Sequence, residues 1–136
     1  MMAGGDQSRW DVLVVDDEEV VRNVAVRVLG AEGLRVVVAQ DAGAALAHAA
    51  LDSCRVVLCD LMLPDRSGLD LLREIRQRRQ DVALICTTGY ATRDQMELAE
   101  QAGATVFLPK PFDEDELLSA VRRALDEGAS PPSRRR

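Results

Sequence analysis

Lysine, aromatic residues and long apolar runs are all scarce in this sequence. Only one of its 17 basic side chains is a lysine, Lys110, and aromatic residues make up 3% of the 136 residues. No apolar run approaches the roughly 18 residues that span a bilayer, and Met1 to Arg9 lacks the apolar core of a signal peptide. We therefore expect no contact with a membrane and a cytoplasmic location.

Disulfide and metal-thiolate patterns are missing as well. The three cysteines, Cys54, Cys59 and Cys86, form no Cys-x-x-Cys pair, and their odd number argues against a disulfide framework. A reducing compartment suits such free thiols. The single histidine, His48, lies in an alanine-rich segment and is interpreted as a surface or packing residue rather than a ligand.

The sequence also has fewer basic than acidic residues. The net charge of −6 argues against direct nucleic-acid binding, which needs a clustered basic face, and the only basic run is Arg134 to Arg136. With 47% hydrophobic and 29% charged residues, the composition is that of a globular protein. The length predicts one domain that buries its own core.

Five short apolar runs indicate strands. They are rich in valine and scarcely alternate with polar residues, which is typical of parallel strands covered on both faces. The runs are Val12 to Val15, Arg35 to Ala39, Val56 to Cys59, Val82 to Cys86 and Thr105 to Leu108.

The segments between and after these runs have helical spacing. The first could also be misread as a strand, because valine is a mediocre helix former, but its length and its Glu18-Glu19 start favour a helix. We expect Asp41, Thr92 and Asp113 to be N-caps. The apolar faces comprise Val20, Val21, Val24, Val28 and Leu29; Ala42, Ala45, Leu46, Ala49 and Ala50; Leu69, Leu72 and Ile75; Met96, Ala99 and Ala102; and Leu117, Val121, Ala124 and Leu125.

Alternation of five strands with five helices predicts the fold class and the domain organisation. The fold is α/β, a flavodoxin-like five-stranded parallel sheet with strand order 2-1-3-4-5 and helices on both faces. We expect residues 1–9 to be a flexible N-terminus, 10–127 to be the single domain, and 128–136 to be a C-terminal tail or linker stub, too short for an output domain.

Polar residues gather where the predicted strands end. Asp16-Asp17 follows the first strand, Asp60 the third, Thr87-Thr88 the fourth and Lys110 the fifth, whereas the second ends in Ala39-Gln40. In an open α/β sheet, ligands bind beyond the carboxyl ends of the strands. The second strand has no comparable polar residues at its end. If it lies at one edge of the sheet, the polar ends of the other four strands stand side by side.

Three carboxylates in one crevice repel one another and need a cation. Oxygen ligands with no histidine or cysteine nearby favour Mg²⁺, with Mn²⁺ possible by the same chemistry. A carboxylate can attack phosphorus and become an aspartyl phosphate, while a metal and a lysine neutralise the phosphoryl oxygens. The pattern therefore predicts phosphoryl chemistry.

At these residues the chain resembles the CheY-like receiver domain of two-component response regulators. The resemblance covers roughly residues 10 to 127. The stretches that carry it are Val14-Val15-Asp16-Asp17, Cys59-Asp60-Leu61-Met62-Leu63-Pro64 with Ser67-Gly68, Thr88-Gly89-Tyr90-Ala91, and Pro109-Lys110-Pro111-Phe112.

The resemblance implies a metal site and an acceptor. Asp60 is the expected phosphoacceptor, and Lys110, joined to Pro111 by a cis peptide, contacts the phosphoryl oxygens. Asp17 ligates Mg²⁺ directly and Asp16 through water, with Asp60 and the main-chain oxygen of Met62 completing the protein ligands.

The resemblance also implies a switch. Thr88 swings towards the phosphoryl group and Phe107 turns inward behind it. Bulky Met62 and Tyr90 stand beside the phosphoryl position, and we predict that they slow its hydrolysis by impeding water.

The implied function is a phosphorelay module in signal transduction, not an enzyme that turns over a separate substrate. It takes its phosphoryl group from a sensor histidine kinase or histidine phosphotransfer protein, or from small donors, and loses it by Mg²⁺-dependent autodephosphorylation. Its output runs through the fourth helix, fifth strand and fifth helix, about Thr92 to Glu127. That surface serves a downstream protein, an attached output domain or a homodimer.

Other interpretations account for parts of the pattern. Taken singly, Asp16-Asp17 and Asp60 are ordinary turn or cap residues, and Lys110 is a solvated charge. An aspartyl-phosphate phosphatase would use a nucleophile after the first strand and a second aspartate two residues on, where this chain has Glu18. A scaffold that takes no phosphate would not need the acidic set.

Overall fold

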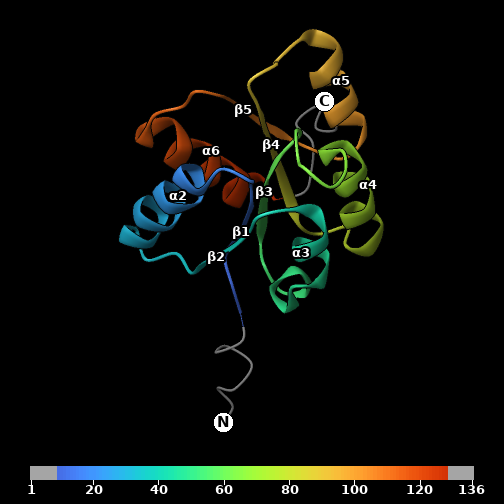
Figure 1. Ribbon diagram of the computed structural model, residues 1–136. Coiled ribbons are helices and arrows are strands. Elements are labelled where there is room, and N and C mark those ends of the chain that lie inside the picture. Colours follow the sequence, from blue (N-terminus) through green and yellow to red (C-terminus); the bar gives the residue numbers. More distant parts are fainter. Residues whose placement is uncertain (1–8, 129–136) are drawn as a thin grey trace.

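The protein, seen here in a computed structural model that describes residues 9–128, is built on a five-stranded parallel sheet (Figure 1). The strand order is β2-β1-β3-β4-β5, so the predicted fold class is confirmed. Residues 1–8 and 129–136, which include most of the predicted flexible N-terminus and tail, lie outside the described residues. The strands are β1 Val12–Val15, β2 Val36–Ala39, β3 Val56–Asp60, β4 Ala83–Thr88 and β5 Val106–Pro109.

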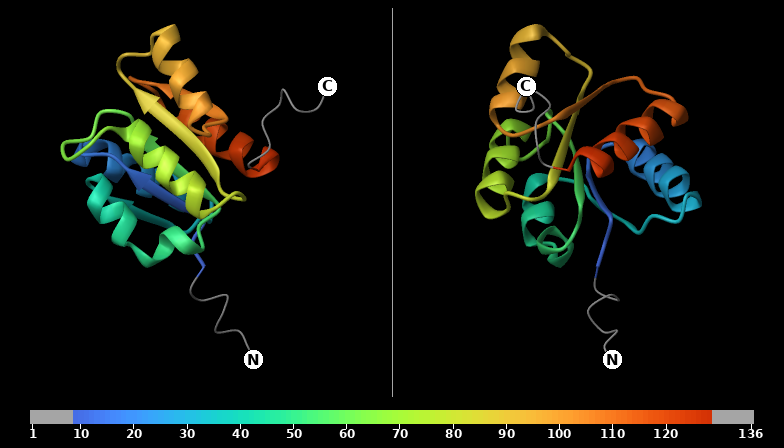
Figure 2. Two further views of the ribbon diagram at one scale, coloured as in Figure 1. Left: turned by 90° about the vertical axis from the view of Figure 1, so that its right-hand side faces the viewer. Right: turned by 180° about the vertical axis from the view of Figure 1, so that it is seen from behind.

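Helices cover both faces of the sheet, α2 and α6 on one and α3, α4 and α5 on the other (Figure 2). Within residues 9–128, no helix has the length and apolar character needed to cross a bilayer. The helices are α2 Glu19–Ala31, α3 Ala42–Ala47, α4 Gly68–Arg78, α5 Arg93–Gln101 and α6 Glu114–Glu127, with a 3₁₀ turn, η1, at Ala49–Asp52.

Each central strand buries side chains on both faces. In β1, Val12 and Val14 pack with α2 and α6, whereas Leu13 and Val15 pack with α3, α4 and α5. All four of these side chains are fully buried. Because neither face meets water, the strands show no polar alternation, as the valine-rich runs predicted.

The valine-rich first segment is the helix α2, so the strand interpretation is wrong for it. Its buried side chains are Ala25, Val28 and Leu29. Val20 was predicted on the buried face, but its side chain is 73% exposed. It lies in the first turn, beside Lys110 and Phe112 in a groove at the carboxyl edge of the sheet, and the core begins one turn later.

The second predicted helix is interrupted at His48. One continuous helix through Ala50 was expected, but α3 ends at Ala47 and η1 begins at Ala49. His48 has an extended backbone, and its Nδ1 accepts a hydrogen bond of 3.0 Å from the Ala50 N–H. The half-buried imidazole thus caps η1, a local role that alanine periodicity does not reveal.

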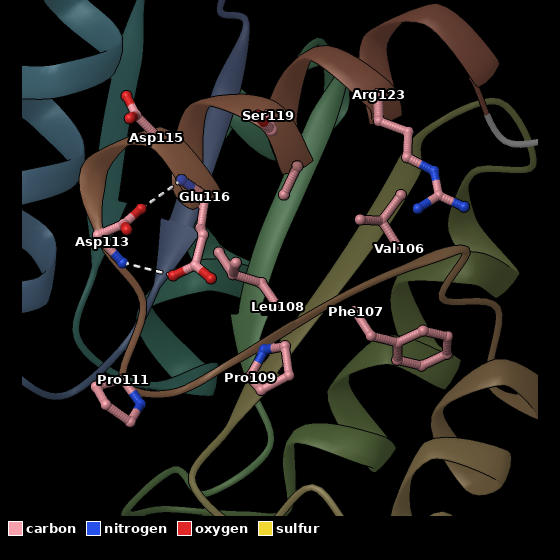
Figure 3. Close-up of a pocket in the computed structure, with 11 residues that line it drawn as sticks. Val106, Phe107, Leu108, Pro109, Pro111, Asp113, Asp115, Glu116, Ser119 and Arg123 are labelled. Carbon is pink, nitrogen blue, oxygen red and sulfur yellow. Dashed lines mark hydrogen bonds between the residues drawn. The ribbon is translucent and has the colours of Figure 1, made fainter.

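The three predicted N-caps are confirmed. Asp41, Thr92 and Asp113 each accept a hydrogen bond from a backbone N–H in the first turn of α3, α5 and α6. At α6 the Glu116 carboxylate also accepts from the Asp113 N–H, which completes a capping box (Figure 3). Gly33, just past the end of α2, has a φ of +86°, which explains why the chain turns at a glycine there.

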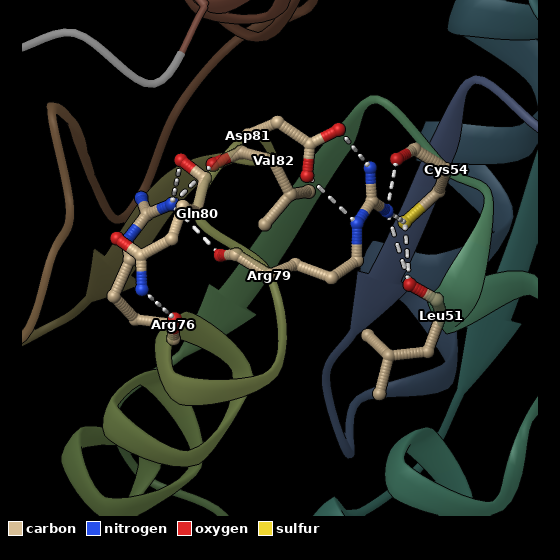
Figure 4. A network of polar contacts seen from close by, with 7 residues as sticks. All are labelled: Leu51, Cys54, Arg76, Arg79, Gln80, Asp81 and Val82. Carbon is tan, nitrogen blue, oxygen red and sulfur yellow. Dashed lines mark hydrogen bonds and ion pairs between the residues drawn. The ribbon is translucent and has the colours of Figure 1, made fainter.

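Two arginines tie the loops together at the amino-terminal edge of the sheet (Figure 4). Arg76, in the last turn of α4, donates to the carbonyls of Arg79, Gln80 and Val82 through Nη1. Its Nη2 donates to the Gly103 carbonyl at 2.8 Å, beyond α5. One guanidinium therefore joins the end of α4, the start of β4 and the turn before β5.

Arg79 does the same for the turn that follows α3. Its Nη1 donates to the carbonyls of Leu51 and Cys54, and its guanidinium forms an ion pair with Asp81. The arginine side chain is only 15% exposed. Buried carbonyls that no strand or helix uses are satisfied in this way.

Candidate functional site

The polar residues that follow the strands meet at the carboxyl edge of the sheet. Asp16 follows β1, Asp60 ends β3, and Lys110 follows β5, where its N–H donates to the Thr88 carbonyl of β4. The Lys110 Nζ lies 2.7 Å from Asp60 Oδ2 and 3.0 Å from Asp16 Oδ2. The predicted convergence of these side chains is confirmed, and the Lys110-Pro111 peptide is cis, as predicted.

Glu18, predicted to lie at the start of the first helix, is a third carboxylate on the same ammonium. Its Oε1 lies 2.7 Å from Lys110 Nζ, and its side chain is 58% exposed at the mouth of the site. The position of Glu18 directly after the aspartate pair could have indicated this contact, because the first turn of α2 begins beside Lys110.

Asp16, Asp17 and Asp60 form a cluster that could hold a metal ion. One carboxylate oxygen of each lies within 4.8 Å of the others. Asp16 and Asp60 are buried, while Asp17 is exposed. Three oxygen donors at this spacing, one of them open to solvent, suit a hard divalent cation that keeps part of its water shell.

The electrostatics of the cluster leave negative charge in excess. Burial raises the pKa of Asp16, against the hydrogen bond from the Glu18 N–H and the attraction of Lys110. Burial acts to lower the pKa of Lys110, but hydrogen bonds to Asp60, Glu18 and Asp16 outweigh it and raise that pKa above its ordinary value. The lysine stays charged, yet one ammonium shared by three carboxylates does not offset the desolvation of Asp16.

The loop after β3 holds the Asp60 carboxylate in place. Its Oδ1 accepts from the Met62 N–H at 2.8 Å, while Oδ2 faces Lys110. A Cβ on Gly68 would lie 2.3 Å from the Asp60 carbonyl oxygen, so α4 can begin this close to the site only with glycine. Met62 and Tyr90, in the loops after β3 and β4, are 58% and 67% exposed.

The two threonines at the end of β4 differ in their surroundings. Thr87 is the register partner of Asp60, and its buried hydroxyl has no hydrogen-bond partner within residues 9–128. Thr88 Oγ1 accepts from the Tyr90 N–H at 3.0 Å. Thr88 and Phe107 line the same small cavity, so the two predicted switch residues are neighbours.

The cysteines near the site are packing residues. Cys59 belongs to the core under α3, α4 and α5. Burial raises the pKa of its thiol well above the ordinary range, and raises that of Cys86 to about 12. Protonated, buried thiols are unreactive.

Comparison with known proteins identifies the family of this chain. The model of the response regulator receiver domain matches residues 12–122. The DNA-binding transcriptional regulator NtrC of Salmonella typhimurium is 38% identical over 117 residues, which are 86% of this chain and 25% of that protein. The transcriptional regulatory protein CpxR of Klebsiella pneumoniae is 36% identical over 114 residues, 84% of this chain and 48% of that protein.

A solved structure has the same fold. The CheY-like response regulator receiver domain protein of Methanospirillum hungatei superposes with a TM-score of 0.81 at 30% identity, covering 88% of this chain and 95% of that one. The chain spans about a quarter to a half of the length of NtrC and CpxR. Because the family model takes in every strand and every residue predicted for the site, the chain belongs to the response regulator receiver domains.

Proposed function

We propose that this receiver domain accepts a phosphoryl group on Asp60 from a phosphohistidine of a sensor histidine kinase or histidine phosphotransfer protein. A carboxylate oxygen of Asp60 forms the new P–O bond as the P–N bond to the donor breaks. Small donors such as acetyl phosphate supply the same group, and hydrolysis of the aspartyl phosphate returns the protein to its starting state. A cytoplasmic location, where such donors occur, is part of the proposal.

One observation carries this proposal: the Asp60 carboxylate belongs to the acidic cluster and also contacts the ammonium of the single lysine. Its Oδ2 is 2.7 Å from Lys110 Nζ, and one of its oxygens lies within 4.8 Å of those of Asp16 and Asp17. Lys110 then holds a phosphoryl oxygen, and the acidic cluster offers a site for the counter-charge. The Met62 N–H keeps the carboxylate oriented towards the edge of the sheet.

Mg²⁺, or Mn²⁺ in its place, fits the donor set. Asp17 and Asp60 would ligate the ion directly, Asp16 through water, and the Met62 main-chain oxygen would complete the protein ligands. Because burial raises the pKa of Asp16, a nearby cation would stabilise its ionised form. When bound, the ion neutralises charge that develops on the phosphoryl oxygens.

Phosphorylation then reaches the output surface through Thr88 and Phe107. The Thr88 hydroxyl moves from the Tyr90 N–H to the phosphoryl group, and Phe107 turns into the space that it leaves. Their shared cavity, bounded by Leu61, Cys86 and Met96, supports this coupling.

The output surface comprises α5, β5 and α6. A groove of about 470 Å³ runs between β5 and the first turns of α6 (Figure 3). Phe107 lines it, with Asp113, Asp115 and Glu116 at one end and Arg123 at the other. We propose that a downstream protein, an output domain or a second copy of the chain binds there.

Intact-mass measurement after incubation with acetyl phosphate and Mg²⁺ tests the proposal. We expect one phosphoryl group on the wild type, none with EDTA, and none on Asp60→Asn. Asp113→Asn, a change of the same charge away from the acidic cluster, serves as the control and should be labelled normally. A phosphoryl adduct that persists in Asp60→Asn would remove Asp60 as the acceptor.

A further inference from the structure

The geometry points to Asp65 as a positioning residue that fixes the loop between β3 and α4, and with it the metal-binding oxygen of Met62, by clamping that loop to the first turn of α3. Asp65 is not itself a ligand in this scheme. The inference rests on the proposed function, because it concerns the loop that would complete the metal site.

The clamp consists of two hydrogen bonds to consecutive amides. Asp65 Oδ1 accepts from the Ala42 N–H at 3.0 Å, and Oδ2 accepts from the Gly43 N–H at 2.9 Å. Asp41 takes the next amide, that of Ala44, at 2.7 Å. The first turn of α3 therefore uses one carboxylate of its own and one from a loop 22 residues away.

The backbone at Gly43 leaves room for the Asp65 carboxylate. A Cβ on Gly43 would lie 3.4 Å from Asp65 Oδ2, so the glycine lets the carboxylate approach the backbone closely. The two amide hydrogen bonds are also what lowers the pKa of Asp65. Asp65 is exposed, so the contact persists without burial and depends on its hydrogen bonds.

The backbone anchors of the loop lie at its base, while Leu63 packs against the core and the exposed Arg66 pairs with Glu74 of α4. Met62 pairs with Ser67 across the base of the loop, the Met62 N–H donates to Asp60, and the Gly68 N–H donates to the Leu61 carbonyl. The Asp65 clamp restrains the tip. Without it the tip loses its tie to α3, and the Met62 backbone, which joins the acceptor carboxylate to the tip, is held less firmly.

The test compares Asp65→Asn and Asp65→Ala with Asp70→Asn. Asparagine keeps the shape but offers one oxygen where two amides need acceptors, and alanine removes both. Asp70 is a matched control, since it is exposed in the first turn of α4 and pairs with Arg73 of its own helix. Asp70→Asn removes the same unit of negative charge, so it tests whether a loss of charge alone moves the Mg²⁺ midpoint.

Three measurements separate positioning from stability: amide hydrogen exchange, the Mg²⁺ midpoint from an NMR titration, and the melting temperature. We expect both Asp65 variants to speed exchange at Ala42, Gly43 and Met62 without metal. We also expect them to raise the Mg²⁺ midpoint about threefold to tenfold, with labelling by acetyl phosphate restored at saturating Mg²⁺. Asp70→Asn should leave the Met62 exchange unchanged and should move the midpoint less.

Two results would overturn the inference. One is faster exchange at Ala42 and Gly43 with an unchanged Met62 amide and midpoint, which would make Asp65 a purely structural cap. The other is an equal midpoint shift in Asp70→Asn, which would reduce the effect to charge. If the wild type itself neither binds Mg²⁺ nor takes a phosphoryl group, the proposed function fails, while the Met62 exchange still decides the positioning role.

Discussion

The two edges of the sheet differ in how their charged and polar groups are paired. At the amino-terminal edge, Arg76 and Arg79 donate to backbone carbonyls that no strand or helix uses, and Arg79 also pairs with Asp81. At the carboxyl edge, Lys110 is shared by Asp16, Asp60 and Glu18. Donors and acceptors match at the first end, whereas negative charge is in excess at the second.

The amino-terminal edge is therefore stabilised by its own hydrogen bonds, whereas the carboxyl edge is able to bind a cation and react. A matched network of buried hydrogen bonds adds stability and asks for no ligand. A cluster of desolvated carboxylates lowers stability until a cation relieves it. Changes at the two ends should therefore have opposite effects on unfolding.

The largest effect on stability is expected at the amino-terminal edge. Arg79→Ala leaves the carbonyls of Leu51 and Cys54 without their donor, at a cost of about 2–3 kcal/mol in the free energy of unfolding. Urea denaturation measures this loss, and the Mg²⁺ midpoint should not change.

Arg73→Ala is the control, because Arg73 makes only an exposed ion pair with Asp70. Its removal should cost less than about 0.5 kcal/mol. Equal losses in the two arginine variants would contradict a special role for the carbonyl network.

At the carboxyl edge, Asp16→Asn should stabilise the metal-free protein. Burial raises the pKa of Asp16, so folding opposes its ionised form, and a neutral side chain should raise the free energy of unfolding at pH 7. The asparagine oxygen still accepts from the Glu18 N–H. Thermal unfolding with and without Mg²⁺ checks this: the cation should stabilise the wild type more than the variant. A less stable Asp16→Asn would mean that the acidic cluster carries no excess charge.

Met62 and Tyr90 give a smaller effect, confined to kinetics. Both side chains are exposed, and if they impede water, Met62→Ala and Tyr90→Ala should shorten the life of the aspartyl phosphate a few fold. Loss of the adduct over time, followed by intact mass, measures this. Val26→Ala, an exposed apolar change on α2, is the control; unchanged decay in both site variants would contradict the prediction.

The smallest expected effect is a pH dependence at Asp81. The hydrogen bond from Arg79 lowers the pKa of Asp81. A lowered pKa in the folded state contributes stability that is present above the unfolded pKa and is lost as the pH falls through the folded value. The stability difference between wild type and Asp81→Asn should therefore shrink below about pH 4. Carbon NMR titration of Asp81 should show the lowered pKa, which Arg79→Ala should restore; an ordinary pKa in the wild type would contradict the pairing.

Much of the fold was predictable because it depends on local patterns. Valine-rich runs mark strands buried on both faces, and Asp41, Thr92 and Asp113 cap helices through their own first turns. The break at His48 was missed because an imidazole cap on η1 competes with alanine's preference for helix. Val20 was misplaced because periodicity does not tell where along a helix the core begins.

The same division holds for the site. The sequence alone determined which side chains end the strands, and therefore that Asp16, Asp60 and Lys110 share one edge, because parallel strands all end on the same side of a sheet. Three other features depend on tertiary packing: Glu18 shares the ammonium of Lys110, Asp65 clamps the first turn of α3, and Arg76 and Arg79 close the far edge. These contacts join residues whose separation along the chain carries no signal, and their geometry is set by how helices and loops pack on the sheet.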